Sequence, residues 1–370
     1  MLSRTADHLF WMARYMERAE NTARMLDVNY QTSLLPQSAD RAEQGWRGML
    51  SISELTQAFF SRYTEVNGPN VMDFMVRDEA NPSSIGACLR AARENARAVR
   101  GALTTEVWET QNQTWLEFVR MMQGARVQRD PGEFFEWVKF RSHLSRGVTV
   151  GTMLQDEALH FLRIGTFLER ADNTARLLDV KFHALTKEFH GVTGMNGAAQ
   201  SQMQSQLQSQ SQSQSQSQSQ SQSQSQSQNG QSQSQNGQSQ SQTIAQDPSE
   251  YDFYHWSAIL RSVSGFEVYR KVYRNVIRPE KVAELLILRP DMPRSLAACM
   301  NEVVTNLRMV ANEHSGETLR RAERLRADVL YVRIDEILET GLHAYLTQFL
   351  DRIGDLGVGI SRDFLVPVAA

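Results

Sequence analysis

The sequence lacks the features of secreted, membrane-spanning and nucleic-acid-binding proteins. Two cysteines in 370 residues form no disulfide framework, so we interpret Cys88 and Cys299 as reduced, buried thiols of a cytoplasmic protein. No apolar run reaches the roughly 18 residues of a membrane span, and the first residues contain no secretion-signal segment. A net charge of −3 without a Lys/Arg block gives no expected surface for nucleic acid.

Motifs that mark common catalytic sites are also missing. The sequence contains no phosphate loop, no dinucleotide fingerprint and no Gly-x-Ser-x-Gly nucleophile turn. His, Cys and acidic residues do not occur at metal-ligand spacing, and the Glu-x-x-His pattern of di-metal helical bundles is absent from the repeated stretch described next. We therefore expect no metal and no cofactor, and the catalytic residues of any activity stay unknown.

One twelve-residue stretch occurs twice. Glu17 to Val28 and Glu169 to Val180 are identical at ten of twelve positions, and the other two are Glu/Asp and Met/Leu exchanges. A shared amphipathic pattern would keep apolar positions similar but would not keep the same charges in the same order. The sequence therefore predicts an internal duplication.

Further matches extend the duplication beyond this stretch. At a shift of 211 residues, five residue types recur in order: Pro82/Pro293, Ser84/Ser295, Cys88/Cys299, Asn95/Asn306 and Arg97/Arg308. At a shift of 210, three more recur: Trp46/Trp256, Leu50/Leu260 and Tyr63/Tyr273. The repeated stretch itself is shifted by 152, so about 59 extra residues lie in the second unit. That length corresponds to a tract of alternating Ser and Gln.

The Ser-Gln tract, 191–248, has almost no apolar residue to offset the entropy of ordering. We interpret it as a disordered insertion in a loop, and a prion-like assembly segment is the alternative for a Gln-rich sequence. The predicted organisation is one integrated bundle with four parts: a first helical unit at 1–152, the motif helix of the second unit at 153–190, the insertion, and the rest of the second unit at 249–370.

The fold class expected is all-α, an internally duplicated helical bundle with pseudo-two-fold symmetry, interrupted by the disordered Ser-Gln-rich loop. Apolar residues at helical spacing support it throughout, and no alternating strand pattern of any length occurs. Short apolar runs at 71–76 and 282–288 stay unassigned, and 147–151 reads as a Gly/Val connection. The predicted helices are 4–34, 41–64, 84–103, 104–122, 133–146, 154–189, 251–276, 290–312, 317–341 and 342–353.

The repeated stretch supplies the candidate site. In the first copy Glu17, Asn21 and Arg24 share one helical stripe, and Arg18 flanks it. The second copy repeats this arrangement with Glu169, Arg170, Asn173 and Arg176.

Three interpretations of these stripes are open. They could form a structural network that fixes how the two halves dock, with Glu of one helix bonded to Arg of its twin. They could line a polar cavity for an anionic or peptide-like ligand, where Arg would bind carboxylate or phosphate and Glu could act as a base. They could also be a solvated face, although solvation alone does not explain the retained order.

These residues resemble a known family. Glu17 to Arg24 and its copy, Phe266 to Arg270, and Met292 to Ser295 are similar to the alpha-E family of bacterial helical proteins, named for a Glu-Arg motif. The resemblance covers the chain except the Ser-Gln tract. It implies an all-α fold without established catalytic residues. It also implies partnership with circularly permuted ATP-grasp ligase-like proteins and transglutaminase-like proteins, in peptide ligation or tagging.

Three hypotheses for function follow. The first is a non-catalytic accessory that binds an ATP-grasp-type peptide or amide ligase, or presents a ligand to it. The second is an enzyme acting on an amide or peptide at the paired Glu-Arg helices. The third is a structural component of a larger assembly, and we expect no nucleic-acid or membrane partner in any of them.

Overall fold

The fold is described from a computed structural model of the protein, which describes residues 1–124, 126–180 and 248–365. The prediction of an all-α protein is confirmed, because every regular element in these ranges is helical and none is a strand. Nearly all of the predicted Ser-Gln insertion lies outside the described residues. None of the helices in these ranges is both long enough and apolar enough to cross a bilayer.

The first half contains α1 (Ser3–Ser33), α2 (Ala39–Ile52), α3 (Thr56–Phe60), α4 (Gly68–Val76), α5 (Ile85–Ala98), a 3-10 turn (Arg100–Ala102), α6 (Thr105–Met122), α7 (Arg126–Arg129) and α8 (Pro131–Thr152). A helix over 157–180 carries the second copy of the repeated stretch. The remaining helices are α10 (Pro248–Ser262), α11 (Phe266–Tyr273), α12 (Pro279–Leu288), α13 (Leu296–Met309), α14 (Gly316–Tyr331), α15 (Ile334–Thr340) and α16 (Leu342–Phe364).

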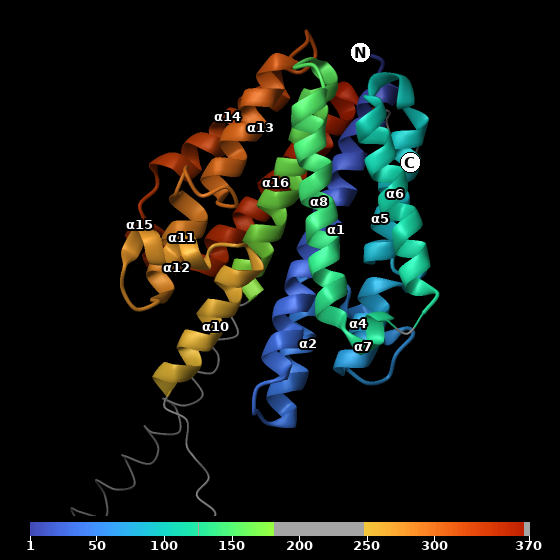
Figure 1. The fold of residues 1–370 in the computed structure, drawn as a ribbon. Helices are drawn as coiled ribbons and strands as arrows, with labels where there is room; N and C mark the ends of the chain where they lie inside the picture. The colour runs from blue at the N-terminus through green and yellow to red at the C-terminus, as the bar shows by residue number, and fades with distance from the viewer. Residues whose placement is uncertain (125, 181–247, 366–370) are drawn as a thin grey trace, which may run out of the picture. The chain divides into compact units, whose positions relative to one another are not determined.

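Each half is built around its motif helix. In the first half α1 packs against α5 and α8, and α6 packs against both of them (Figure 1). In the second half α13 packs against α14, and α14 packs against α16. The helix over 157–180 joins this second group through a hydrogen bond between His160 and Asn306 of α13, 2.8 Å long, and through ring contact between Phe161 and Phe364 of α16.

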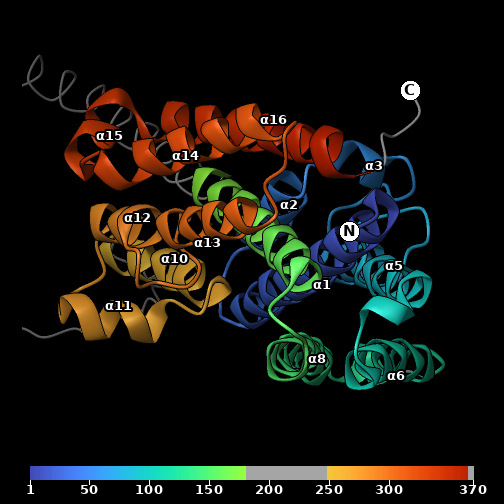
Figure 2. The same ribbon diagram turned by 90° about the horizontal axis from the view of Figure 1, so that it is seen from above.

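The two motif helices lie side by side, as seen from above in Figure 2. They approach closely at Gly165, where an added Cβ would lie 2.4 Å from the Phe10 carbonyl oxygen and 3.3 Å from the Ala13 Cβ. A hydrogen at this position lets the two backbones come together. Glu17 and Glu169 lie four residues beyond Ala13 and Gly165, and each bonds an arginine of the other motif helix.

Helices α5 and α13 begin in the same way. Ser84 accepts a hydrogen bond from the Ala87 amide at 3.2 Å, and Ser295 accepts one from the Ala298 amide at 3.0 Å. A serine that precedes a helix satisfies an amide left without a partner in the first turn. The two serines are 211 residues apart. This shared start supports the duplication, whose pseudo-two-fold symmetry stays a prediction.

The prediction of single helices over 41–64, 251–276 and 317–341 is wrong, and the last of these ranges is divided into α14 and α15. Glu54 divides the first and Ser264 the second, with φ of 55° and 52°. At each helix end a backbone amide donates to the carbonyl five residues earlier, from Leu55 to Leu50 at 2.9 Å and from Gly265 to Leu260 at 2.7 Å. This is the Schellman ending, in which a left-handed residue stops the helix. Such endings favour glycine, so a glutamate and a serine at these positions did not predict the end of a helix.

Two further corrections concern helices that the sequence did not reveal. The expected connection at 147–151 is helical, because α8 continues to Thr152, and the helix predicted to end at 353 continues to Phe364. The unassigned apolar runs are α4 and α12. The segment 67–70 is the start of α4, where the Asn67 side chain accepts from the Asn70 amide at 2.9 Å.

Candidate functional site

The Glu-Arg pairs of the two motif helices bind each other crosswise. Glu17 accepts hydrogen bonds from Nε and Nη2 of Arg170, at 2.8 and 2.9 Å. Glu169 accepts from Nε and Nη2 of Arg18, at 2.6 and 3.0 Å. Both pairs have the two-pronged geometry that makes arginine–carboxylate bonds strong. This is the contact between twin helices that the network interpretation predicts.

Two carboxylates in the first motif helix lie at the centre of a larger group, which we call the Glu17 cluster: Glu17, Glu20, Arg24, Arg146, Arg170 and Arg294. Glu17 also accepts from Arg146 and Arg294, both at 3.0 Å. Glu20 accepts from Arg24 at 2.8 Å and from Arg146 and Arg294 at 2.5 Å. Arg294 additionally donates to Asn21 at 2.8 Å.

The Glu17 cluster contains four guanidinium groups and two carboxylates, and both carboxylates are at most 1% exposed. Arginine does not lose its proton in proteins, so two positive charges are left without a carboxylate inside the cluster. Burial lowers the pKa of Arg294, and the neighbouring Arg170 and Arg24 lower it further against the pull of the carboxylates. This buried imbalance would favour a bound anion.

The carboxylates of the cluster are poor bases. Burial alone would raise the pKa of Glu17, but Arg170 and Arg294 outweigh it and lower the value to about 2. The pKa of Glu20 is likewise well below its usual range, because Arg294, Arg146 and Arg24 outweigh the effect of burial. A general base works best with a pKa near the working pH, so neither group suits proton abstraction near neutrality.

This low pKa predicts acid sensitivity. Unfolded chains bind a proton at Glu17 near the ordinary value of 4.5, whereas the folded protein binds it near 2, so protons favour the unfolded state in between. Stability from this group should be complete above pH 4.5 and should be lost as the pH falls towards 2, by an amount on the order of 3 kcal/mol. Urea unfolding at successive pH values measures it, and a Glu17→Gln variant with an equally steep acid loss would contradict it.

A second group surrounds the other motif helix, and we call it the Glu169 cluster: Glu169, Asp172, Arg14, Arg18, Arg176 and Glu54. Glu169 accepts from Arg14 at 2.7 Å, besides Arg18. Arg176 donates to Asp172 at 2.8 Å and pairs with Glu54. Three carboxylates and three guanidiniums balance here. Arg14, Arg18, Asp172, Asn173 and Arg176 also line a cavity of about 260 Å³.

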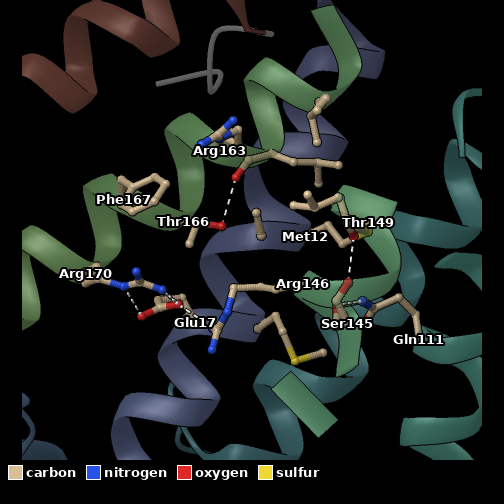
Figure 3. Close-up of a pocket in the computed structure, with 15 residues that line it drawn as sticks. Met12, Glu17, Gln111, Ser145, Arg146, Thr149, Arg163, Thr166, Phe167 and Arg170 are labelled. Atoms are coloured by element: carbon tan, nitrogen blue, oxygen red, sulfur yellow. Dashed lines mark hydrogen bonds and ion pairs between the residues drawn. The ribbon is translucent and has the colours of Figure 1, made fainter. Parts of the chain in front are cut away.

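Another cavity, of about 140 Å³, borders the Glu17 cluster between α1, α8 and the helix over 157–180. Figure 3 shows Arg146 and Arg170 reaching Glu17 from either side at one end of it. Its polar lining also includes Gln111, whose Nε2 donates to Ser145 at 2.6 Å. Apolar side chains of both motif helices line the rest, among them Met12, Ala13, Met16, Leu159, Leu162 and Phe167.

The eight predicted site residues do not all meet in one place. Glu17 with Arg170, and Glu169 with Arg18, form the crossed pairs. Arg24 instead binds Glu20 of its own helix and Ser264, and Arg176 binds Asp172 and Glu54 in the same pattern. Asn21 and Asn173 do not bond each other but line the same 260 Å³ cavity.

Six participants escaped prediction, and one of them is Glu54, which follows the end of α2 and pairs with Arg176. Glu20 and its counterpart Asp172 lie within the repeated stretch. Both copies have an acidic residue at this position, and that observation could have included them in the predicted site. Arg294 lies in the Met292–Ser295 segment but not in either stripe. Arg14 and Arg146 carried no signal, because nothing in the sequence places α8 or the first turns of α1 against these carboxylates.

Matched contacts recur at His8 and His160, which the shift of 152 relates, and at the repeated cysteines. His8 bonds Asn95 at 2.7 Å, as His160 bonds Asn306 at 2.8 Å. Cys88 and Cys299 each lie 4.0 Å from a proline carbonyl, of Pro82 and Pro293. Burial raises the pKa of both thiols to about 12, so neither is a nucleophile near neutral pH.

Glu17-Arg18 and Glu169-Arg170 are both Glu-Arg dipeptides, and an ER motif is the feature by which one family of helical domains is described. The model of Alpha-E, a predicted alpha-helical domain with a conserved ER motif, matches residues 1–229 and 234–365. The chain belongs to the Alpha-E family. No curated protein and no solved structure matches it. In this Alpha-E protein the two ER pairs, Glu17-Arg18 and Glu169-Arg170, bind one another across the two halves.

Proposed function

We propose that this Alpha-E protein is a non-catalytic accessory that binds a carboxylate-bearing ligand in the 140 Å³ cavity and acts with an ATP-grasp-type amide or peptide ligase. The observation that carries the proposal is the charge imbalance of the Glu17 cluster. Two guanidinium charges there lack a carboxylate, and Arg146 and Arg170 line the cavity. Arg146 is 29% exposed at its side chain, so a ligand from solvent could reach it.

The lining of the cavity favours a short carboxylic acid over a bare inorganic anion. Its volume is close to that of a cavity which admits a benzene-sized molecule. Arg146 and Arg170 would bind the carboxylate at one end, where guanidinium groups suit its two oxygens. Met12, Leu162 and Phe167 would contact an aliphatic arm. The acidic side chain of a peptide or a small dicarboxylic acid has this shape.

A carboxylate ligand agrees with the partner that the family resemblance implies. An amide ligase joins a carboxylate to an amine, so a protein that holds a carboxylate could present one reactant to such an enzyme. A transglutaminase-like protein, the other implied partner, also acts on side-chain amides and amines. Purification together with an ATP-grasp-type ligase encoded beside the protein tests this association separately from ligand binding.

The enzyme hypothesis has less support. The low pKa of Glu17 and of Glu20 makes both carboxylates weak bases. The Ser142 hydroxyl donates a hydrogen bond to Glu20 at 2.7 Å, so the group beside this serine is one of these weak bases. A purely structural role is the second candidate, because the crossed pairs Glu17–Arg170 and Glu169–Arg18 join the two halves. Buried ion pairs can fix geometry while adding little net stability.

Calorimetric titration distinguishes the carboxylate receptor from the structural role. Glutarate should bind at pH 7, and glutaramide, which has the same length without charge, should bind at least ~10-fold more weakly, as the loss of a charged hydrogen bond implies. Arg146→Gln should weaken glutarate binding by a similar factor with the fold retained.

The matched control is Arg352→Gln. Arg352 is 31% exposed and paired with Asp328 at 2.6 Å, so it resembles Arg146 in exposure but lies outside the cavity. Its loss should leave glutarate binding unchanged. Equal binding of glutarate and glutaramide, or an unchanged affinity in Arg146→Gln, would overturn the proposal in favour of the structural role.

A further inference from the structure

The 260 Å³ cavity beside the Glu169 cluster occupies a place that is filled in the other half of the molecule. A shift of 152 relates Glu17 to Glu169, Glu20 to Asp172, and Asn21 to Asn173. Around the first three residues, the Arg294 guanidinium bonds all of them, at 3.0, 2.5 and 2.8 Å. Around the second three, the residue that corresponds to Arg294 at a shift of 211 is Ser83. Ser83 lines the cavity.

Glu17 accepts one side-chain hydrogen bond more than Glu169 does. Oε1 of Glu17 accepts from Arg170 and from Arg294, whereas Oε1 of Glu169 accepts from Arg18 alone among the residues that the structure describes. Their Oε2 atoms each accept from two arginines. A carboxylate oxygen has two lone pairs. Glu169 therefore has an acceptor position free where Arg294 would lie by repeat equivalence.

Asn21 supplies a separate sign that a ligand belongs here. Its side chain is 3% exposed and lines the cavity, and its Oδ1 accepts from Arg294. Its Nδ2 is buried and has no hydrogen-bond partner among the described residues. A buried donor without a partner is costly, by about 1–3 kcal/mol, unless something in the cavity accepts from it. The ligand should thus carry an acceptor as well as a cation.

The mouth of this cavity is open to solvent. Glu54 lines the cavity, and its side chain is 72% exposed. Glu54 is also the residue with left-handed backbone that follows α2. Arg176 pairs with Glu54 at this edge. The charges around the cavity balance, so a ligand that carries both a cation and an acceptor group meets no net repulsion.

We propose that the cavity beside Glu169 binds the guanidinium group of arginine, free or as a residue of a peptide. Arg294 occupies the equivalent place beside Glu17. The ligand guanidinium donates to Oε1 of Glu169, to Asp172 and to the Asn173 side chain, as Arg294 does to Glu17, Glu20 and Asn21. Its carboxylate or peptide carbonyl accepts from Nδ2 of Asn21. This site is distinct from the carboxylate cavity and does not depend on it.

Calorimetry with L-arginine, N-acetyl-L-arginine methylamide and agmatine tests the proposal. At least one of the first two should bind, and citrulline, the neutral isostere, should bind at least ~10-fold more weakly, since its urea group lacks the charge that strengthens bonds to carboxylates. Agmatine has no acceptor for Asn21 and should bind more weakly than the better of the two. Tighter binding of the capped residue identifies a peptide ligand, and tighter binding of the free amino acid identifies a metabolite.

The decisive variant gives the Glu169 site the arginine that the Glu17 site has at the equivalent position. Ser83→Arg should place a guanidinium in the cavity and abolish arginine binding, with a melting temperature equal to or above that of the wild type. Ser83→Met, which fills the space without charge, should also block binding, and Ser83→Ala should bind as the wild type does. Arginine binding that persists in both filling variants, equal affinity for citrulline, or no binding of any arginine compound would overturn the proposal.

Discussion

Replacing Glu17 with glutamine should lower the free energy of unfolding by about 3–5 kcal/mol, as expected when one partner of a buried ion pair is removed. Glu17 is 1% exposed and accepts from Arg170, Arg146 and Arg294. Without its charge, four guanidiniums would share the single carboxylate of Glu20. Chemical denaturation, followed by far-ultraviolet circular dichroism, measures the change.

The repeat provides the control for this prediction. Glu169→Gln removes the equivalent carboxylate, but its partners Arg14 and Arg18 are 18% and 27% exposed and can turn to solvent. We expect Glu169→Gln to cost clearly less than Glu17→Gln, because the arginines that it leaves lie nearer to solvent than Arg170 and Arg294, which are 7% exposed. Adding Arg294→Met to Glu17→Gln should recover part of the loss by removing one unpaired charge. Equal losses in the two single variants would show that charge imbalance does not set the stability of the Glu17 cluster.

The crossed ion pairs were predictable because a duplication constrains them. Two copies of one helix that dock on each other bring the same residues together from both sides, so a Glu-Arg pair in one copy has an Arg-Glu pair to meet. The helical spacing of apolar residues then placed most helices correctly. Neither argument needed any knowledge of distant contacts.

The parts that could not be predicted depend on residues in which the two halves differ. Arg146 and Arg294 correspond to Gly357 and Ser83 at the shift of 211, so the repeat gave no reason to connect them with the Glu-Arg pairs. Their contacts with Glu17 join residues 129 and 277 positions apart. Local spacing cannot reveal such contacts. The helix endings at Glu54 and Ser264 were missed for another reason, since left-handed backbone at these residue types has no propensity signal.

These differences give the two halves distinct chemistry on one scaffold. The Glu17 cluster contains Arg146 and Arg294, which have no arginine counterpart in the repeat, and it holds excess positive charge beside a small amphipathic cavity. The Glu169 cluster has balanced charges beside a larger polar cavity. Both proposed ligand sites therefore follow from departures from the repeat rather than from the shared residues, which join the halves.

Replacing Gly165 with alanine should disrupt the contact between the two motif helices. The added Cβ would lie 2.4 Å from the Phe10 carbonyl oxygen, and a backbone atom cannot move aside as a flexible side chain can. The motif helices would have to separate, which would strain the crossed pairs, so we expect a loss of about 3 kcal/mol, at the upper end for overpacked sites. The sign is opposite to helix propensity, because alanine in place of glycine within an exposed helix gains up to about 1 kcal/mol.

Gly147→Ala is the matched control for Gly165→Ala, because Gly147 lies within α8, is exposed, and has nothing within 4 Å of an added Cβ. Thermal and urea unfolding should show a gain for Gly147→Ala and a large loss for Gly165→Ala. If both alanine variants were stabilised, the helices would not be in contact at Gly165. The crossed Glu-Arg pairs would then lose the close approach on which their geometry depends.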